Sequence, residues 1–206
     1  MKKLNAICKL PFVRLNGALV QVPGYDDETG IYSHFDLGGT PPVPPEPNQD
    51  QIISAIKTAM HPWSKYRFAT TEDRGAMLAA VMTAVCHPAL VICPGFFLDA
   101  PVQSSGKSKC AAALGALMKG ERAGVTPFIA GPGSEPEFVK KLVAMALVGE
   151  GFLLIDNVVG TWHSPVLAGL ITEGQINERI LGANQWFRGA SRMLITATGN
   201  NASLDH

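Results

Sequence analysis

The chain has 206 residues, 47% of them hydrophobic and 17% charged, which is enough apolar material for one core and a small appendage. Basic and acidic residues number 17 each, so the formal net charge is zero and gives no overall attraction to nucleic acid. The four cysteines form no CxxC pair, which argues against a zinc site and a disulfide framework. No apolar run near the N-terminus is long enough for a signal peptide or a membrane span, so we expect a cytoplasmic protein without a membrane partner.

Turn signals and prolines divide the first quarter of the chain. Residues 1–35 predict a small β-rich arm, because Asn16-Gly17 stands between two apolar segments as the turn of a hairpin. Residues 36–50 hold a crowded run of prolines and predict a stiff linker, with a ligand for a partner domain as the alternative. We assign residues 51–206 to the main domain.

Two helices are expected at the start of that domain. The first covers 49–60, where apolar residues recur at helical spacing, and His-Pro-Trp at 61–63 ends it. The second begins at a capping box made by Thr70 and Asp73 and stops at His87-Pro88.

After Pro94 short apolar runs alternate with helical patterns. The runs GFFLDA, TPFIA, GFLLIDN and RMLITAT predict strands, and the segments between them predict helices, one capped by Ser134 and another opened by Ser164-Pro165. Such alternation predicts a parallel sheet with crossover helices, a three-layer α/β/α domain.

The strongest functional signal is PVQSSGKS at 101–108, between an expected strand and an expected helix. It fits the phosphate-binding loop GxxxxGK[ST] except that Pro101 replaces the first glycine. Gly106 allows the backbone to curl, Lys107 neutralises the β- and γ-phosphates of ATP, and the Ser108 hydroxyl ligates Mg²⁺. An ordinary strand-to-helix turn is the alternative. The residues expected to contact the nucleotide are Val102, Gln103, Ser104, Ser105, Gly106, Lys107, Ser108 and Lys109.

Two further strands supply polar groups of the same chemistry. Asp156 follows an apolar strand, where its carboxylate is expected to hold Mg²⁺ directly or through water. The next residue is Asn157, where many related ATPases have a glutamate that activates water. Asn200 follows the last strand and is expected to orient water against the γ-phosphate. We predict catalytic roles for Lys107, Asp156, Asn157 and Asn200, although Asp156 and Asn200 considered alone are also ordinary turn residues.

These elements resemble the AAA+ group of P-loop ATPases. The segments DAPVQSSGKSK, FLLIDNV, RILGANQWF and TATGNN look most similar to phage- and mobile-element-encoded primase/helicase-associated ATPases, and their order is similar to that of superfamily III helicases. The resemblance covers roughly 60–201. It implies a P-loop NTPase core, a homo-oligomeric ring and roles for Lys107, Ser108, Asp156 and Asn200 at the nucleotide.

The resemblance also directs attention to the end of the chain. Because the sequence stops at His206, we expect the last core strand and the helical lid to be missing. Arg179, Arg188 and Arg192 are the arginines downstream of Asp156, each a candidate for action across a subunit boundary or a solvated side chain. The segment 175–192 predicts a hairpin, and superfamily III helicases touch DNA with a hairpin at this place; a buried Trp186-Phe187 pair is the alternative.

The leading function is therefore Mg²⁺-dependent ATP hydrolysis in an oligomeric motor that acts on single-stranded DNA during mobile-element replication. The alternative is a truncated or degenerate module that binds nucleotide without turnover and serves as an interaction subunit. A small-molecule kinase is a third hypothesis, which the missing lid and the Asn200 element disfavour.

Overall fold

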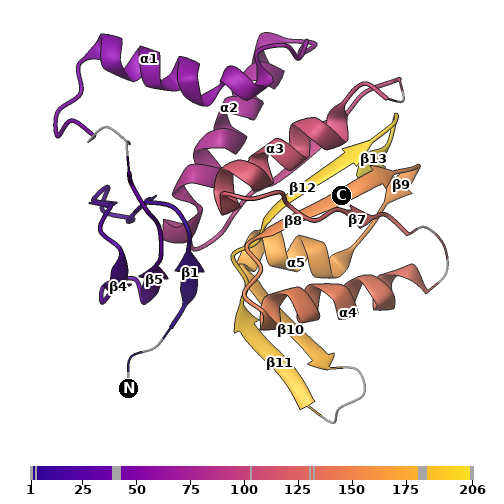
Figure 1. Cartoon of the computed structure of the whole chain (residues 1–206). Helices are drawn as coiled ribbons and strands as arrows, with labels where there is room; N and C mark the ends of the chain where they lie inside the picture. The colour runs from indigo at the N-terminus through magenta and orange to yellow at the C-terminus, as the bar shows by residue number, and fades with distance from the viewer. Residues whose placement is uncertain are drawn as a thin grey trace.

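The computed structural model describes residues 2, 4–38, 43–102, 104–129, 131, 133–180 and 185–204. At its centre lies a four-stranded sheet in the order β6-β12-β8-β7 (Figure 1), and every neighbouring pair in it is parallel. The strands are β6 (Gly95–Asp99), β12 (Leu194–Gly199), β8 (Phe152–Val158) and β7 (Thr126–Pro127). The predicted α/β class with a parallel sheet is confirmed, although β7 is shorter than the predicted strand.

Helices cover both faces of this sheet. On one face α2 (Thr71–Cys86) and α3 (Lys107–Lys119) pack on Phe152 and Leu154 of β8. On the other face α4 (Ser134–Leu147) and α5 (Pro165–Glu173) pack on Leu153 and Ile155. Successive residues of a strand point to opposite faces, and burying each such side chain contributes about 1.5–3 kcal/mol. The unbroken apolar run of β8 therefore reflects a strand buried on both sides.

Local capping groups fix most helix starts. The predicted capping box at Thr70 and Asp73 is present, and Ser164 accepts a hydrogen bond from the Leu167 amide at the start of α5. The prediction that Ser134 caps α4 is wrong. Gly133 is the N-cap, with a φ of 83°, and Ser134 is already the first helical residue because the left-handed glycine turns the chain into the helix.

Shorter elements complete the main domain. The helix α1 (Gln49–Ala59) has no buried residue, and the 3₁₀ turns η1 (His61–Trp63) and η2 (His87–Ala89) follow α1 and α2. The predicted hairpin is present as β10 (Gln175–Ile180) and β11 (Gln185–Ala190), which are antiparallel. The short strands β9 (Thr161–Trp162) and β13 (Ser203–Leu204) pair with each other.

Short strands also make up the N-terminal arm. The strands β1 (Ala6–Cys8), β5 (Ile31–Ser33) and β4 (Gly24–Asp26) form one sheet, while β2 (Phe12–Val13) and β3 (Leu19–Val20) form the hairpin predicted at Asn16-Gly17. Gly17 has a φ of 84°, as such a turn requires. Phe12 is buried where β2 contacts α2 and η2, so the arm packs on the main domain.

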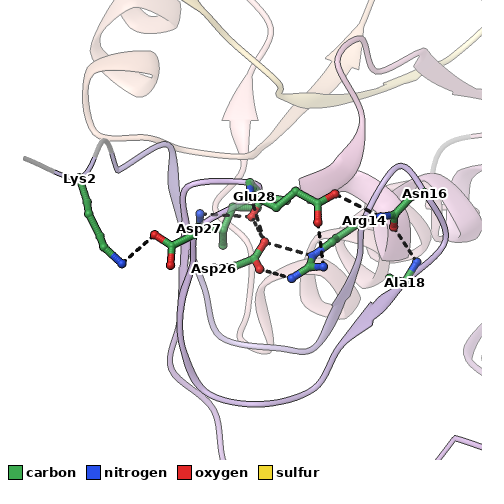
Figure 2. A network of polar contacts seen from close by, with 9 residues as sticks. Lys2, Arg14, Asn16, Ala18, Asp26, Asp27 and Glu28 are labelled. Carbon is green, nitrogen blue, oxygen red and sulfur yellow. Dashed lines mark hydrogen bonds and ion pairs between the residues drawn. The ribbon is translucent and has the colours of Figure 1, made fainter.

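An ionic network holds the arm together (Figure 2). Arg14 forms ion pairs with Asp26 and Glu28, and Asp26 also accepts hydrogen bonds from the amide and hydroxyl of Thr29. Burial alone raises the pKa of Asp26, but the hydrogen bonds from Arg14 and Thr29 outweigh it and leave this pKa below its ordinary value. The network therefore stabilises the turn before β5.

The predicted linker and the domain boundaries on either side of it stay predictions. The proline-rich residues 39–42 lie outside the described residues, and the boundaries at 35 and 50 stay predictions. Among the described helices, none is long and apolar enough to cross a membrane. The cytoplasmic location remains an expectation from the sequence.

Candidate functional site

The carboxyl ends of three parallel strands bring the predicted residues together. The strand β6 leads through the loop at 100–106 into α3, and β12 lies between β6 and β8. Because the ends of parallel strands meet at one edge of a sheet, Asp156 and Asn200 lie beside Lys107 and Ser108. This edge is where ligands bind in open α/β sheets.

The loop turns sharply into the helix. Gly106 is the N-cap of α3 with a φ of 89°, and Ser104 has a φ of 61°. Among the described residues no side chain caps this helix, which leaves the amide groups of its first turn to bind an anion. The side chains of Val102, Ser104, Ser105 and Lys109 are exposed, and Gln103 lies outside the described residues.

The ammonium group of Lys107 lies inside the loop. Its Nζ donates to the carbonyl oxygen of Val102 at 3.1 Å, to Ser105 Oγ at 3.1 Å and to Asn200 Oδ1 at 2.8 Å. All three acceptors are neutral. Within the described part of the chain, the positive charge of Lys107 has no carboxylate partner, and this suits it to an anionic ligand.

Ser108 and Asp156 are in direct contact. Ser108 Oγ donates to Asp156 Oδ1 at 2.5 Å, and the hydroxyl of Thr198 donates to the same oxygen at 2.7 Å. Thr198 is buried, and its oxygen also accepts from the backbone amide of Asn157 at 3.1 Å. Thr198 therefore fixes the orientation of the carboxylate. Sequence reasoning missed this role, although the two threonines of an otherwise apolar, fully buried strand, Thr196 and Thr198, were a signal for it.

A β-bulge places Asp156 and Asn157. The pairing of β12 with β8 passes from Ala197↔Ile155 to Gly199↔Val158, so β8 has one extra residue at this point. Asn157 has a φ of 65°, which asparagine tolerates better than most residues. The predicted strand end is thus a bulge, with β8 continuing to Val158. Because of the bulge, Val158 packs on the face covered by α4 and α5, while Asp156 faces α3 on the other side.

Asn157 and Asn200 join the two halves of the site. Asn200 Nδ2 donates to Asn157 Oδ1 at 3.0 Å, while Asn200 Oδ1 accepts from Lys107. A continuous hydrogen-bonded network therefore runs through three elements, α3, β8 and β12. Its members, the strand-tip network, are Lys107, Ser108, Asp156, Asn157, Thr198 and Asn200.

The donor set fits one kind of divalent cation better than others. The described residues contain no cluster of three or more His, Cys, Asp or Glu side chains that could hold a metal alone. One hydroxyl and one carboxylate at Ser108 and Asp156 suit Mg²⁺, which keeps several water ligands and shares phosphate oxygens with its protein ligands. The site therefore fits a magnesium–triphosphate complex.

The three downstream arginines do not join the site of their own chain. Arg192 donates to the Pro88 carbonyl at 3.5 Å, before β12 begins and so at the opposite edge of the sheet. Arg179 and Arg188 lie on the hairpin of β10 and β11, which projects away from the carboxyl edge (Figure 1).

The same hairpin places Trp186 and Phe187 on opposite faces, so the alternative of a buried Trp186-Phe187 pair is wrong. Trp186 is 60% exposed, whereas Phe187 packs on the core of the α4 side. The alternation of β11 explains the split, because neighbouring residues face opposite sides of the ribbon.

Comparison of the chain with protein-family models, with curated proteins and with solved structures finds no match. The strand-tip network is therefore the feature of the molecule that points to a function.

Proposed function

We propose that the chain binds Mg²⁺-ATP at the loop 101–108 and hydrolyses it as part of an oligomeric motor. The observation that carries this proposal is the strand-tip network, in which a lysine and a serine from the loop meet an aspartate and an asparagine from two neighbouring strand ends. An ordinary strand-to-helix turn gives no reason for these four residue types to converge.

Each side chain has a defined task in this proposal. The amides of the α3 N-terminus and Lys107 bind the β- and γ-phosphates. Mg²⁺, when bound, neutralises charge on the phosphates. Ser108 and Asp156 hold the cation, and Thr198 keeps the Asp156 carboxylate aimed at Ser108. Asn200 orients the attacking water, with its amide fixed by Lys107 and Asn157.

The outer face of the hairpin supports single-stranded DNA as the partner. Its cross-strand pairs are Gln175↔Ala190, Asn177↔Arg188 and Arg179↔Trp186, so its described residues combine two cations, two amides and an aromatic ring without a carboxylate. The guanidinium of Arg188 lies 5.9 Å from the ring centroid of Trp186 and bonds to Asn177 through Nε. Arginine and exposed tryptophan are the side chains that bind phosphates and stack on bases. A role in mobile-element replication rests on the family resemblance.

A second candidate is a module that binds nucleotide without turnover. Asn157 favours it, because an amide stands next to Asp156 where a carboxylate would accept a proton, and that amide is engaged by Asn200. Arg179, Arg188 and Arg192 also lie away from the loop of their own chain, so any of them that stabilises charge at a nucleotide has to act on a neighbouring subunit. A finger of this kind commonly contributes about three to five powers of ten in rate.

The test is calorimetric binding of ATP with and without Mg²⁺, followed by phosphate release with and without single-stranded DNA, on the full chain. We expect Mg²⁺-ATP binding, slow hydrolysis in dilute monomeric protein, and faster hydrolysis as concentration or DNA promotes assembly. Ser108→Ala should weaken binding mainly when Mg²⁺ is present. Binding without any turnover under assembly conditions would favour the second candidate, and no binding at all would refute both.

A further inference from the structure

The phosphate loop has a second neighbour besides the strand tips. A Cβ atom placed at Gly106 would lie 3.2 Å from Cε1 of Tyr66 and 3.6 Å from the Tyr66 hydroxyl oxygen. Tyr66 belongs to the segment 61–68 between α1 and α2, forty residues before Gly106 in sequence. Its half-buried ring packs on the α2–α3 core and keeps part of its surface accessible.

The segment is anchored to the beginning of α3. Trp63 is 1% exposed, and its Nε1 donates to the carbonyl oxygen of Cys110 at 3.0 Å. The backbone amide of Tyr66 donates to the Trp63 carbonyl at 3.1 Å. Gly106 and Cys110 are four residues apart and so lie on one side of the helix. Trp63 and Tyr66 therefore border the same side of the first turn of α3.

That side lies opposite the metal chemistry. Ser108 follows Gly106 by two residues, which places it about 200° around the helix axis, and its hydroxyl points to Asp156. The γ-phosphate and its cation belong on that side, beside the strand-tip network. The rest of a nucleotide has to leave the loop on another side, and the ring of Tyr66 is the aromatic surface there.

We propose that Tyr66 forms the wall against which the nucleoside of the bound nucleotide packs, so that the site prefers a nucleoside triphosphate to a bare polyphosphate. This inference rests on the proposed function, because it concerns the same loop. Burial, and to a lesser extent the neighbouring Cys110, raises the pKa of Tyr66, so its phenol stays protonated and can donate to a ribose or base acceptor.

The experiment compares two ligands on four proteins. Calorimetry measures the affinities of Mg²⁺-ATP and Mg²⁺-tripolyphosphate for the wild-type chain and for Tyr66→Ala, Tyr66→Phe and Phe68→Ala. Phe68 is the matched control, because it packs partly buried on the same core from the same segment. We expect Tyr66→Ala to lose about tenfold in ATP affinity, the size of one base–aromatic stack, with tripolyphosphate affinity unchanged. Tyr66→Phe should keep most of the ATP affinity, and Phe68→Ala should keep the wild-type ratio of the two affinities.

The outcomes separate this inference from the proposed function. Equal losses for both ligands in Tyr66→Ala would mean that the ring only supports the loop, and no loss for either would mean that it touches no ligand. Both results overturn the inference and leave nucleotide binding intact. If Phe68→Ala changes the ratio as much as Tyr66→Ala, the effect belongs to the segment and the inference also fails. A wild-type chain that binds neither ligand refutes the proposed function and this inference with it.

Discussion

The molecule contains two polar networks, and they differ in whether their charged side chains are paired within the protein. In the N-terminal arm, Arg14 meets the carboxylates of Asp26 and Glu28, so its positive charge is matched inside the protein. At the carboxyl edge of the sheet, Lys107 donates only to neutral oxygens, among them Asn200 Oδ1, within the described part of the chain. A network that neutralises itself stabilises the fold, whereas an unmatched cation is a place for an anion to bind.

The carboxylates of the two networks differ in the same way. Asp26 receives hydrogen bonds from a guanidinium and from Thr29. Asp156 receives its hydrogen bonds from the hydroxyls of Ser108 and Thr198, which leave its negative charge uncompensated. The contrast teaches that the arm network is complete without a ligand, while the strand-tip network holds one unmatched charge of each sign for a metal and a phosphate.

The largest expected effect separates binding from stability. Lys107→Ala should weaken ATP binding by about 100-fold, the loss expected for a charge-assisted hydrogen bond to phosphate, with little change in melting temperature. Arg14→Ala should do the reverse, lowering the melting temperature while the folded protein keeps its ATP affinity. Calorimetric titration and thermal unfolding of both variants measure the two effects.

Lys57→Ala is the control for Lys107→Ala, because Lys57 is an exposed lysine on α1 and far from the loop in sequence. It should change neither quantity. If Lys107→Ala lowers the melting temperature as much as Arg14→Ala does, Lys107 is a structural residue, and the contrast between the two networks is wrong.

A second prediction uses isosteric substitutions of the two aspartates. Asp26→Asn removes the negative charge beside Arg14 and should lower the melting temperature by about 5 °C. Asp156→Asn keeps an oxygen that accepts from Ser108 and Thr198, so the melting temperature should change by less than about 2 °C. Thermal unfolding at neutral pH and low salt measures both shifts, and equal shifts in the two variants would contradict the division of roles.

The strand-tip network also predicts an effect on hydrolysis at Asn157. Asn157→Gly tolerates the φ of 65° and removes the contact with Asn200, so it should slow hydrolysis about fivefold without weakening ATP binding. Asn157→Asp keeps an acceptor for Asn200 and adds a carboxylate, so it should hydrolyse ATP at least as fast as the wild type. Steady-state phosphate release under assembly conditions gives both rates. Faster hydrolysis in Asn157→Gly would show that Asn200 does not depend on this contact.

The sequence predicted the elements of the site better than their connections. The loop at Lys107, the strand before Asp156 and the amide at Asn200 follow from local patterns. Each of these patterns spans one helix or strand and the residues next to it in sequence. Alternation of strands and helices also predicted the parallel sheet, which puts the strand ends on one edge.

The features that the sequence did not predict are mostly contacts between segments that are distant in sequence. The bulge at Asn157 depends on how β8 pairs with β12, and no local pattern in FLLIDN distinguishes it from a strand end. Tyr66 reaches Gly106 only because Trp63 anchors its segment to α3. The cap at Gly133 was missed for a different reason, since Ser134 with Glu137 has every local sign of a capping box.

The smallest expected effect concerns a partly buried histidine, His87, at the edge of the sheet that faces the arm. His87 lies in η2, which contacts β2 of the arm, and its Nε2 bonds to the carbonyl oxygen of Arg192. Burial lowers the pKa of His87, and this outweighs the hydrogen bond to that carbonyl, which raises it; the charge of Arg192 lowers the pKa further. Like the ionic network of the arm, the contact between His87 and Arg192 is complete within the protein.

The prediction is a dependence of stability on pH that His87 causes. The folded chain resists protonation of His87 and the unfolded chain does not, so the free energy of unfolding should fall as the pH drops below about 6.5 and level off below the folded-state pKa. His87→Gln, whose amide can still donate to the Arg192 carbonyl, should flatten this fall between about pH 7 and 5. Denaturant unfolding across that range measures the slope, with His34→Gln, at an exposed position just after β5, as the control. An unchanged slope in His87→Gln, or the same flattening in His34→Gln, would remove His87 as its source.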